Sequence, residues 1–277
     1  MEVKITPAKK FQGINKQYLR EIYAYRDMLF MLVRRDISSV YKQTVLGFAW
    51  AVFRPLVQMV VFTLFFGKLL GVGKQVGNDV PYALFSYAAL VPWTYFAGSM
   101  NVATGSLVAS KHFLTKVYFP RIVVPMAPII SKMVDFFIAF AILVVLLLIY
   151  GVYPSWQVIL LPLPFVLLVL TSFGISIWLS AMAIQYRDIQ QLMMFFAQLL
   201  MYAAPVIWPL SIIPEKFQLI YSAYPMVGVI EGFRASLLGN KPFPYEMIGI
   251  GYATSISMVI GGIIYFRNRE RKFADVA

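Results

Sequence analysis

Long apolar stretches alternate with short polar segments along most of the chain. Six stretches reach the length of about 20 mostly apolar residues that a helix needs to cross the hydrocarbon core of a membrane. They lie at roughly 48–70, 82–108, 122–150, 158–184, 189–209 and 247–266. The pattern predicts an all-α integral membrane protein with six transmembrane helices.

The segment 210–246, between the last two predicted spans, has a different pattern. Prolines recur through it, and charged residues interrupt its apolar pieces. We expect two short helices, near 214–222 and 225–238, that dip into the membrane or lie on it as a re-entrant segment. Such backbone is tolerated at membrane depth only where protein or a water-filled cavity covers it.

Residues 18–46, before the first span, show apolar positions at helical spacing with basic positions on the other faces. A basic amphipathic helix next to a span is typical of a helix lying in the membrane interface. The alternative is a solvated helix that packs on a soluble partner. The two interpretations are compatible.

Composition supports the membrane class. Of the 277 residues, 60% are hydrophobic and only 13% are charged, and the mean hydropathy is +0.75. A soluble domain of this length cannot bury so much apolar surface. The chain has no cysteine, so disulfides, thiol chemistry and cysteine metal sites are excluded. Residues 1–46 lack an apolar run near the start, so we expect the first span to act as an uncleaved targeting signal.

The net charge of +12 has a topological explanation. Seventeen Lys and Arg residues fall on one side of the predicted spans, against four on the other. The seventeen are in 1–47, 109–121, 185–188 and the tail from 267. Because basic loops stay in the cytoplasm, both termini are predicted to be cytoplasmic. Nucleic-acid binding is therefore not expected.

Two acid–base pairs fall inside apolar surroundings. Asp135 follows Lys132 by three residues, and Arg234 follows Glu231 at the same spacing. Residues three apart share a helix face, so each pair can neutralise itself. We expect structural ion pairs here rather than a proton relay.

The sequence contains no recognisable catalytic or nucleotide-binding motif. The nearest approach to a phosphate-binding loop is "GKLLGVGKQVG" at 67–77. It has Gln75 where Ser or Thr must hold magnesium, and Lys68 where the first glycine belongs. With one histidine and no cysteine, no metal site is expected either. We expect a membrane pore that is not an enzyme, that holds no cofactor itself and that depends on another protein for energy.

The predicted cytoplasmic loop 109–121 is short, basic and apolar at once. Its apolar residues fall on one helical face about two turns long, and Pro120 ends that helix. The face could insert into a groove on a partner, with lysines at the rim. Equally, it could be a basic interfacial loop anchored by aromatic residues. The residues concerned are Lys111, Phe113, Leu114, Lys116, Val117 and Tyr118.

Polar residues mark one stripe on each of two predicted spans. The first span has Arg54, Gln58 and Phe62 at steps of four, with Phe65 nearby, and the fifth has Gln198 and Tyr202. Amides, hydroxyls and rings suit the hydroxyls and flat faces of sugars. Alternatively, the glutamines join helices, at roughly 0.6 kcal/mol each, and Arg54 snorkels to the headgroups.

Two long motifs resemble a known family. "RRDISSVYKQTVLGFAWAVFRPLVQMVVFTLFFG" (34–67) is similar to the opening signature of bacterial ABC-2 polysaccharide-export permeases, which include Wzm-type O-antigen permeases with capsule and teichoic-acid relatives. "AIQYRDIQQLMMFFAQLLMYAAPVIWPLSIIP" (183–214) is similar to that family's loop, fifth span and exit. With the six-span plan, the resemblance covers nearly the whole chain.

The resemblance implies a homodimer with two copies of a separate ATPase subunit, which would bind ATP and magnesium. It implies ATP-driven export of a lipid-linked polysaccharide, and it favours docking of the loop residues 111–118 on the ATPase. It also implies a membrane-interface helix before the first span, with Arg34, Arg35, Asp36, Tyr41 and Lys42. A glycan channel between the first and fifth spans would be lined by Arg54, Gln58, Phe62, Phe65, Gln198 and Tyr202.

The expected organisation has three parts: a cytoplasmic segment 1–47, a six-span domain 48–266 and a cytoplasmic tail 267–277. The domain includes the loop 109–121 and the external segment 210–246. The expected location is the bacterial cytoplasmic (inner) membrane. The alternatives are an ABC-2 drug or peptide exporter, and a passive channel or ATP-independent flippase.

Overall fold

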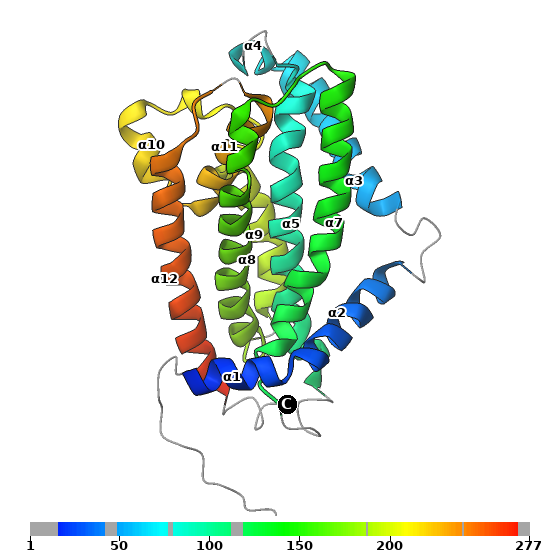
Figure 1. Ribbon diagram of the computed structural model, residues 1–277, viewed down its shortest axis with the longest axis vertical. Coiled ribbons are helices and arrows are strands. Elements are labelled where there is room, and N and C mark those ends of the chain that lie inside the picture. Colours follow the sequence, from blue (N-terminus) through cyan, green and yellow to red (C-terminus); the bar gives the residue numbers. More distant parts are fainter. Residues whose placement is uncertain are drawn as a thin grey trace, which may run out of the picture.

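The computed structural model describes residues 16–41, 49–76, 80–111, 119–186, 188–239 and 241–270. Every regular element in these ranges is a helix, as the hydrophobic pattern predicts (Figure 1). The elements are α1 (Lys16–Ala24), α2 (Arg26–Tyr41), α3 (Ala49–Phe62), η1 (Thr63–Leu69), α4 (Gly73–Val76), α5 (Tyr82–Ala109), α7 (Val123–Ile149), η2 (Trp156–Leu160), α8 (Pro162–Ala183), α9 (Asp188–Ala203), η3 (Leu210–Ile212), α10 (Glu215–Tyr221), α11 (Pro225–Leu238) and α12 (Tyr245–Glu270).

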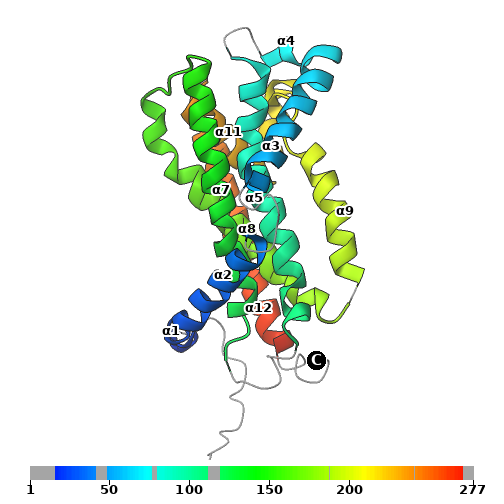
Figure 2. The ribbon, with the colours of Figure 1, turned by 90° about the vertical axis from the view of Figure 1, so that its right-hand side faces the viewer.

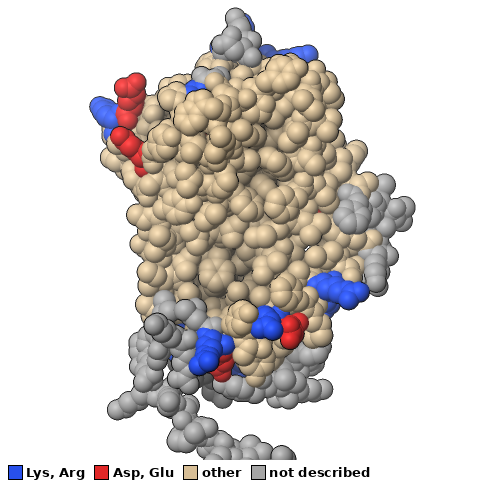
Figure 3. Space-filling view, in the orientation of Figure 1, with Lys and Arg blue, Asp and Glu red and all other residues tan. Residues whose placement is uncertain are grey.

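Within the described ranges, four helical stretches are long and apolar enough to cross a membrane. They are Ala49–Leu69, Val123–Ile149, Trp156–Ala183 and Tyr245–Glu270. The long helices run roughly along one axis, and on the face seen in Figure 3 the charged side chains gather near its two ends. An uncharged band between two charged ends is what a bilayer requires. The first, third, fourth and sixth predicted spans correspond to these stretches.

Helix α5, at the second predicted span, occupies the centre of the bundle. Most of its 28 residues are buried, and small side chains and ring hydroxyls are frequent along it. The Tyr95 hydroxyl donates to the Ile129 carbonyl at 3.1 Å, and the Tyr87 hydroxyl donates to the Ala139 carbonyl at 3.4 Å. These bonds give the buried hydroxyls partners on α7, so α5 can be polar in sequence and still lie inside the bundle.

Helices α8 and α12 approach each other through glycine. A Cβ atom at Gly174 would lie 2.9 Å from the Val259 backbone nitrogen, and one at Gly262 would lie 3.0 Å from the Gly174 carbonyl oxygen. Only residues without side chains allow two helix backbones to come so close, as at small-residue contacts in membrane bundles. This close contact joins α8 and α12 into one unit.

Helix α9 is shorter than the predicted fifth span 189–209. It ends at Ala203, because Pro205 lacks the amide hydrogen that a continuing helix needs and restricts the residue before it. In Figure 2, α9 lies at the right edge of the bundle and α3 lies toward the viewer in front of α5, so both helices are on the outside of the bundle. Each exposes large apolar residues there, including Phe53 and Val57 on α3 and Phe195 on α9.

The amphipathic segment forms two helices rather than one. The break falls at Tyr25, whose amide donates to the carbonyls of Glu21 at 3.3 Å and Ile22 at 3.1 Å, which tightens the last turn of α1. Leu32 and Val33 of α2 pack into a second hydrophobic cluster at this end of the bundle. Helix α1 lies across the lower end of the bundle in Figure 1, and α2 rises obliquely from it.

The short helices predicted at 214–222 and 225–238 correspond to α10 and α11. Every residue of α11 is buried. The Arg234 Nη1 atom lies 2.9 Å from Glu231 Oε1, and Lys132 Nζ lies 2.7 Å from Asp135 Oδ2. Both expected ion pairs are therefore confirmed.

Candidate functional site

A cavity of about 930 Å³ lies among the end of α2, the first half of α3, and helices α5, α7 and α9. Its walls mix aromatic rings, amides and charged groups within an otherwise apolar bundle. A concave site with an apolar lining and a few polar groups is the usual form of a ligand-binding site. We therefore take this cavity as the candidate functional site.

The α3 wall carries Trp50, Arg54 and Gln58 at successive steps of four. Residues four apart lie on one helix face, so the three side chains line the cavity together. The Arg54 guanidinium carbon lies 5.3 Å from the centroid of the Trp50 ring, a cation–π contact. Among the described residues Arg54 makes no salt bridge, so its charge stays available to a ligand.

The α9 wall carries Gln198, Met201 and Tyr202. Gln58 Nε2 donates to the Met201 sulfur at 3.4 Å, which joins this wall to α3 through a weak acceptor. Gln198 is exposed and makes no side-chain hydrogen bond within the described ranges. Tyr202 is also exposed, at 56% of its surface. The interhelical role considered for the glutamines thus applies to Gln58 in part and not to Gln198.

The remaining walls come from α5, α7 and the end of α2. The Lys132–Asp135 pair lines the cavity. Lys132 donates to Oδ2 of Asp135, and the Tyr41 hydroxyl donates to Oδ1 of the same carboxylate. The pKa of Tyr41 is raised above its ordinary value, mainly by burial and to a smaller extent by this hydrogen bond. The phenol therefore stays protonated and can act as a donor. From α5, Asn101 lines the cavity with a buried Oδ1 atom that has no described partner.

The structure brings together four of the six predicted channel residues, namely Arg54, Gln58, Gln198 and Tyr202. The other two lie elsewhere. Phe62 is buried in the main core, where its ring meets Phe66 edge-on at 5.6 Å, and Phe65 is 55% exposed on η1. Neither lines this cavity.

The predicted interface-helix residues divide between the cavity and the surface of α2. Tyr41 lines the cavity, Arg34 is exposed, and Arg35 Nη2 lies 2.8 Å from Asp36 Oδ1. Lys42 lies outside the described residues. Of the predicted docking-loop residues, Lys111 is described as a half-buried position after α5. The others, Phe113, Leu114, Lys116, Val117 and Tyr118, also lie outside the described ranges.

Sequence reasoning missed how several residues meet in this cavity. It interpreted Lys132 and Asp135 only as a pair, and it did not connect them with Tyr41 or Asn101. A tyrosine before a span and an acid within one are weak signals separately, because nothing local brings positions 41 and 135 together. The α5 residue Trp93, which lines the cavity, gave no signal in an aromatic-rich sequence.

The walls of the cavity offer several kinds of contact to a ligand. Within the described part of the chain, no group of three or more His, Cys, Asp or Glu residues could hold a metal ion. The walls offer hydrogen-bond donors and acceptors, ring faces and the Arg54 cation. Such groups can hold a polar, hydroxyl-rich molecule, which is the class of ligand that the polar stripes indicate.

Comparison with known proteins gives a consistent result. Residues 28–238 match the family of ABC-2 type transporters. The chain is 30% identical to the O-antigen export system permease protein RfbA of Klebsiella pneumoniae over 254 residues, which cover 90% of this chain and 95% of the relative. It is 27% identical to the Myxococcus xanthus protein of the same name, over 93% of this chain and 98% of the relative. It is 22% identical to the polysialic acid transport protein KpsM of Escherichia coli, over 86% of this chain and 92% of the relative.

Proposed function

Because the chain belongs to the ABC-2 type transporter family, we propose that it is the membrane subunit of an ATP-driven exporter of lipid-linked polysaccharide. Curated relatives that match nearly the whole chain are named for O-antigen export, which supports a glycan as the cargo. The membrane is the bacterial cytoplasmic membrane, and the chain itself catalyses no reaction.

The observation that carries this proposal is the composition of the cavity between α3 and α9. Arg54, Gln58, Gln198 and Tyr202 line it beside Trp50, so amides, a hydroxyl, a cation and a ring share one space. Sugars offer many hydroxyls and weakly polar ring faces, and these groups complement both. Because each contact is individually weak, a polymer can exchange one sugar unit for the next as it moves.

The proposed topology has six spans. Besides the four strongly apolar stretches, α5 and α9 cross the membrane, α5 shielded by its neighbours and α9 facing the transport path. Both termini are cytoplasmic, as the distribution of Lys and Arg favours. In this arrangement α10 and α11 form the re-entrant external segment, and α1 with α2 lies in the cytoplasmic interface. The parts are thus 1–47, 48–266 and 267–277.

The functional unit is a homodimer with two ATPase subunits. The exposed apolar residues Phe53 of α3 and Phe195 of α9 are next in sequence to the cavity-lining residues Arg54 and Met194, and they favour closure of the path by a second copy. The ATPase subunits bind ATP and magnesium and dock on the loop residues 111–118. This division of labour fits a chain in which no nucleotide-binding motif is recognisable.

The test is a cysteine scan of the cavity, which the cysteine-free chain permits without background labelling. Gln58→Cys, Gln198→Cys and Tyr202→Cys should react with a small polar thiol reagent during ATP turnover. Modification at these positions should block the appearance of polysaccharide on the cell surface, because the adduct occupies the transport path.

The matched controls are Val60→Cys and Leu199→Cys, which are about half exposed, at 50% and 45%, and do not line the cavity. Lipid should cover them, so they should label slowly and modification should leave export intact. If the two controls label fast and the three cavity positions do not react, the transport path follows another face of α3 and α9. Normal surface polysaccharide in cells that lack the chain would reject glycan export altogether.

A further inference from the structure

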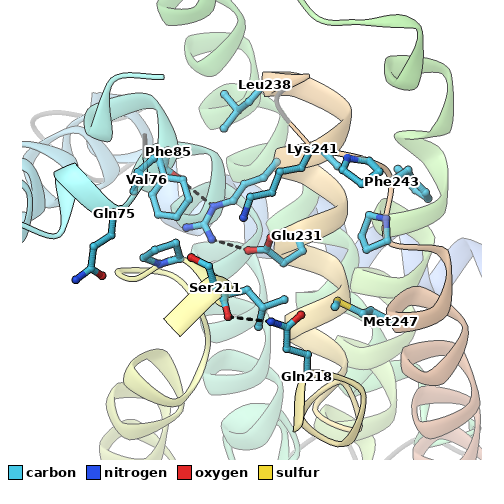
Figure 4. Close-up of a pocket in the computed structure, with 16 residues that line it drawn as sticks. Gln75, Val76, Phe85, Ser211, Gln218, Glu231, Leu238, Lys241, Phe243 and Met247 are labelled. Carbon is cyan, nitrogen blue, oxygen red and sulfur yellow. Dashed lines mark hydrogen bonds and ion pairs between the residues drawn. The ribbon is translucent and has the colours of Figure 1, made fainter. Parts of the chain in front are cut away.

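A second cavity, of about 360 Å³, lies at the opposite end of the bundle from the described chain ends. Residues of α4, the first turn of α5, the stretch 209–211, α10, α11 and the stretch 241–247 enclose it (Figure 4). In the proposed topology this end is external. The volume is at the lower end of the range of about 300–1,000 Å³ for small-molecule sites.

The base of this cavity is a charged pair in a fixed position. Arg234 Nη1 donates to Glu231 Oε1 at 2.9 Å, Nε to the Phe85 carbonyl at 3.2 Å, and Nη2 to the Val206 carbonyl at 2.9 Å. The guanidinium carbon also lies 3.5 Å from the Phe85 ring centroid. Only 3% of Arg234 and 6% of Glu231 are exposed. Four contacts to three elements hold the pair in place.

The fixed pair leaves hydrogen-bonding capacity directed at the cavity. Glu231 Oε2 has no hydrogen-bond partner among the described residues, so it can accept from a ligand. Gln218 uses its Nε2 atom on the Ile213 carbonyl at 2.8 Å, which leaves its Oε1 atom as a further acceptor. Figure 4 places Gln218 and Lys241 on either side of Glu231.

The rim supplies the complementary donors. Lys241 and Ser211 line the cavity and are exposed, and the Lys241 ammonium makes no salt bridge in the described ranges. An ammonium offers three donors and a serine hydroxyl can donate or accept. Between rim and base the walls are apolar, with Leu238, Phe243 and Met247. Polar groups thus occupy the two ends of a space with apolar sides.

The charge balance selects the class of ligand. Two cations against one carboxylate disfavour a metal ion, and the Glu231 carboxylate at the base disfavours a phosphate. A neutral, hydroxyl-rich molecule fits both ends of the cavity. A hydroxyl at the base can donate to Glu231, and another hydroxyl at the rim can accept from Lys241. Its C–H faces can rest on the apolar walls. A single sugar unit has this combination of groups.

We infer that this cavity is an exit-side binding site for one sugar unit of the exported polysaccharide, separate from the cavity between α3 and α9. The inference rests on the proposed function for the identity of the glycan. A site at this end would hold a unit that has already crossed and would oppose its return. Lys241 and Glu231 are the residues that recognise the hydroxyls.

The experiment uses Ser211→Cys as a reporter in the purified full-length transporter. The probe is the polysaccharide released by mild acid from the cells that make this transporter, then freed of lipid. A polar maleimide should label Ser211→Cys readily, and the polysaccharide should slow labelling. At about nine times Kd the labelling rate should fall about tenfold, since the unoccupied fraction is 1/(1 + [L]/Kd). Lys241→Ala in the same background should raise the Kd that describes this protection about fivefold, because it removes a charged donor.

The matched control is Lys216→Cys, an exposed position on α10 that does not line the cavity, and its labelling should not change. No protection at Ser211→Cys, equal slowing at both cysteines, or protection that Lys241→Ala leaves intact would each overturn the inference. Surface polysaccharide in cells carrying the unaltered chain tests the proposed function separately. Export without protection would reject this site alone, and failure of the unaltered chain to restore export would reject the proposed function.

Discussion

Replacing Arg234 by methionine should strongly destabilise the fold at the end of the bundle that contains α11. The variant removes one partner of a pair that is almost completely buried, and it removes the donor that Arg234 gives to the Phe85 and Val206 carbonyls. Breaking a buried ion pair from one side costs about 3–5 kcal/mol, because the remaining charge is desolvated without compensation. The free energy of unfolding of Arg234→Met should fall by about that amount.

A double-mutant cycle separates the charge effect from the lost hydrogen bonds. Glu231→Gln removes the carboxylate and leaves the buried Arg234 cation without its counter-charge, so it should also cost about 3–5 kcal/mol alone. In Glu231→Gln/Arg234→Met no buried charge remains, so the double variant should be no less stable than Arg234→Met. The coupling energy should therefore be at least as large as the cost of Glu231→Gln, well beyond the roughly 0.3–0.5 kcal/mol within which independent sites add.

The assay is unfolding of the purified chain in mild micelles by added dodecyl sulfate, followed by the fluorescence of its five tryptophans. Lys216→Met serves as the exposed control and should stay within about 0.5 kcal/mol of the unaltered chain. If Arg234→Met also stays within that margin, or if the two single changes simply add, the buried pair does not hold these elements together.

Three further predictions concern topology, docking and helix contact. A reporter fused to the carboxyl terminus should remain cytoplasmic and one inserted near Gly77 should be exported; protease accessibility checks this, and the opposite pattern would invert the orientation. Phe113→Ala with Tyr118→Ala should weaken the binding free energy of the ATPase by about 2 kcal/mol or more, so that less ATPase is recovered on co-purification and export falls. Full ATPase recovery with normal export would favour the interpretation of 109–121 as an interfacial loop. Gly174→Ala should destabilise the α8–α12 contact by about 1–3 kcal/mol, whereas Gly261→Ala, with open space around it, should not; equal unfolding curves for both would contradict the close approach.

Local pattern was sufficient for most elements and for part of the candidate site. Apolar length located the strongly apolar spans, and proline and charge located α10 and α11. Steps of four placed Arg54 and Gln58 on one face, but Phe62 turned away. Phe62 lies three such steps beyond Trp50, the first α3 residue on the cavity face, and is therefore rotated from it by about 120° in a helix of 3.6 residues per turn. This rotation carries Phe62 toward the core, close to the point where α3 gives way to η1.

Contacts between distant segments were beyond the reach of the sequence. Tyr41 and Asp135 are 94 residues apart, and only the oblique course of α2 beside α7 brings them together. The break at Tyr25 likewise has no proline or glycine to announce it, and nothing in the structure gives it a simple cause. The end of α9 was foreseeable from Pro205, but its apolar continuation argued for a longer span.

The uneven burial of the helices has a dynamic consequence. Helix α5 is enclosed by its neighbours, and α8 and α12 meet backbone to backbone, whereas α3 and α9 stand at the margin with large faces uncovered. Regions with fewer buried contacts open at lower free energy, and their amide protons exchange sooner. Amides of α3 and α9 should therefore exchange with solvent deuterium before those of α5. Helices α3 and α9, which form two walls of the cavity, can then move and change its width at small energetic cost, while the rest of the bundle keeps its shape.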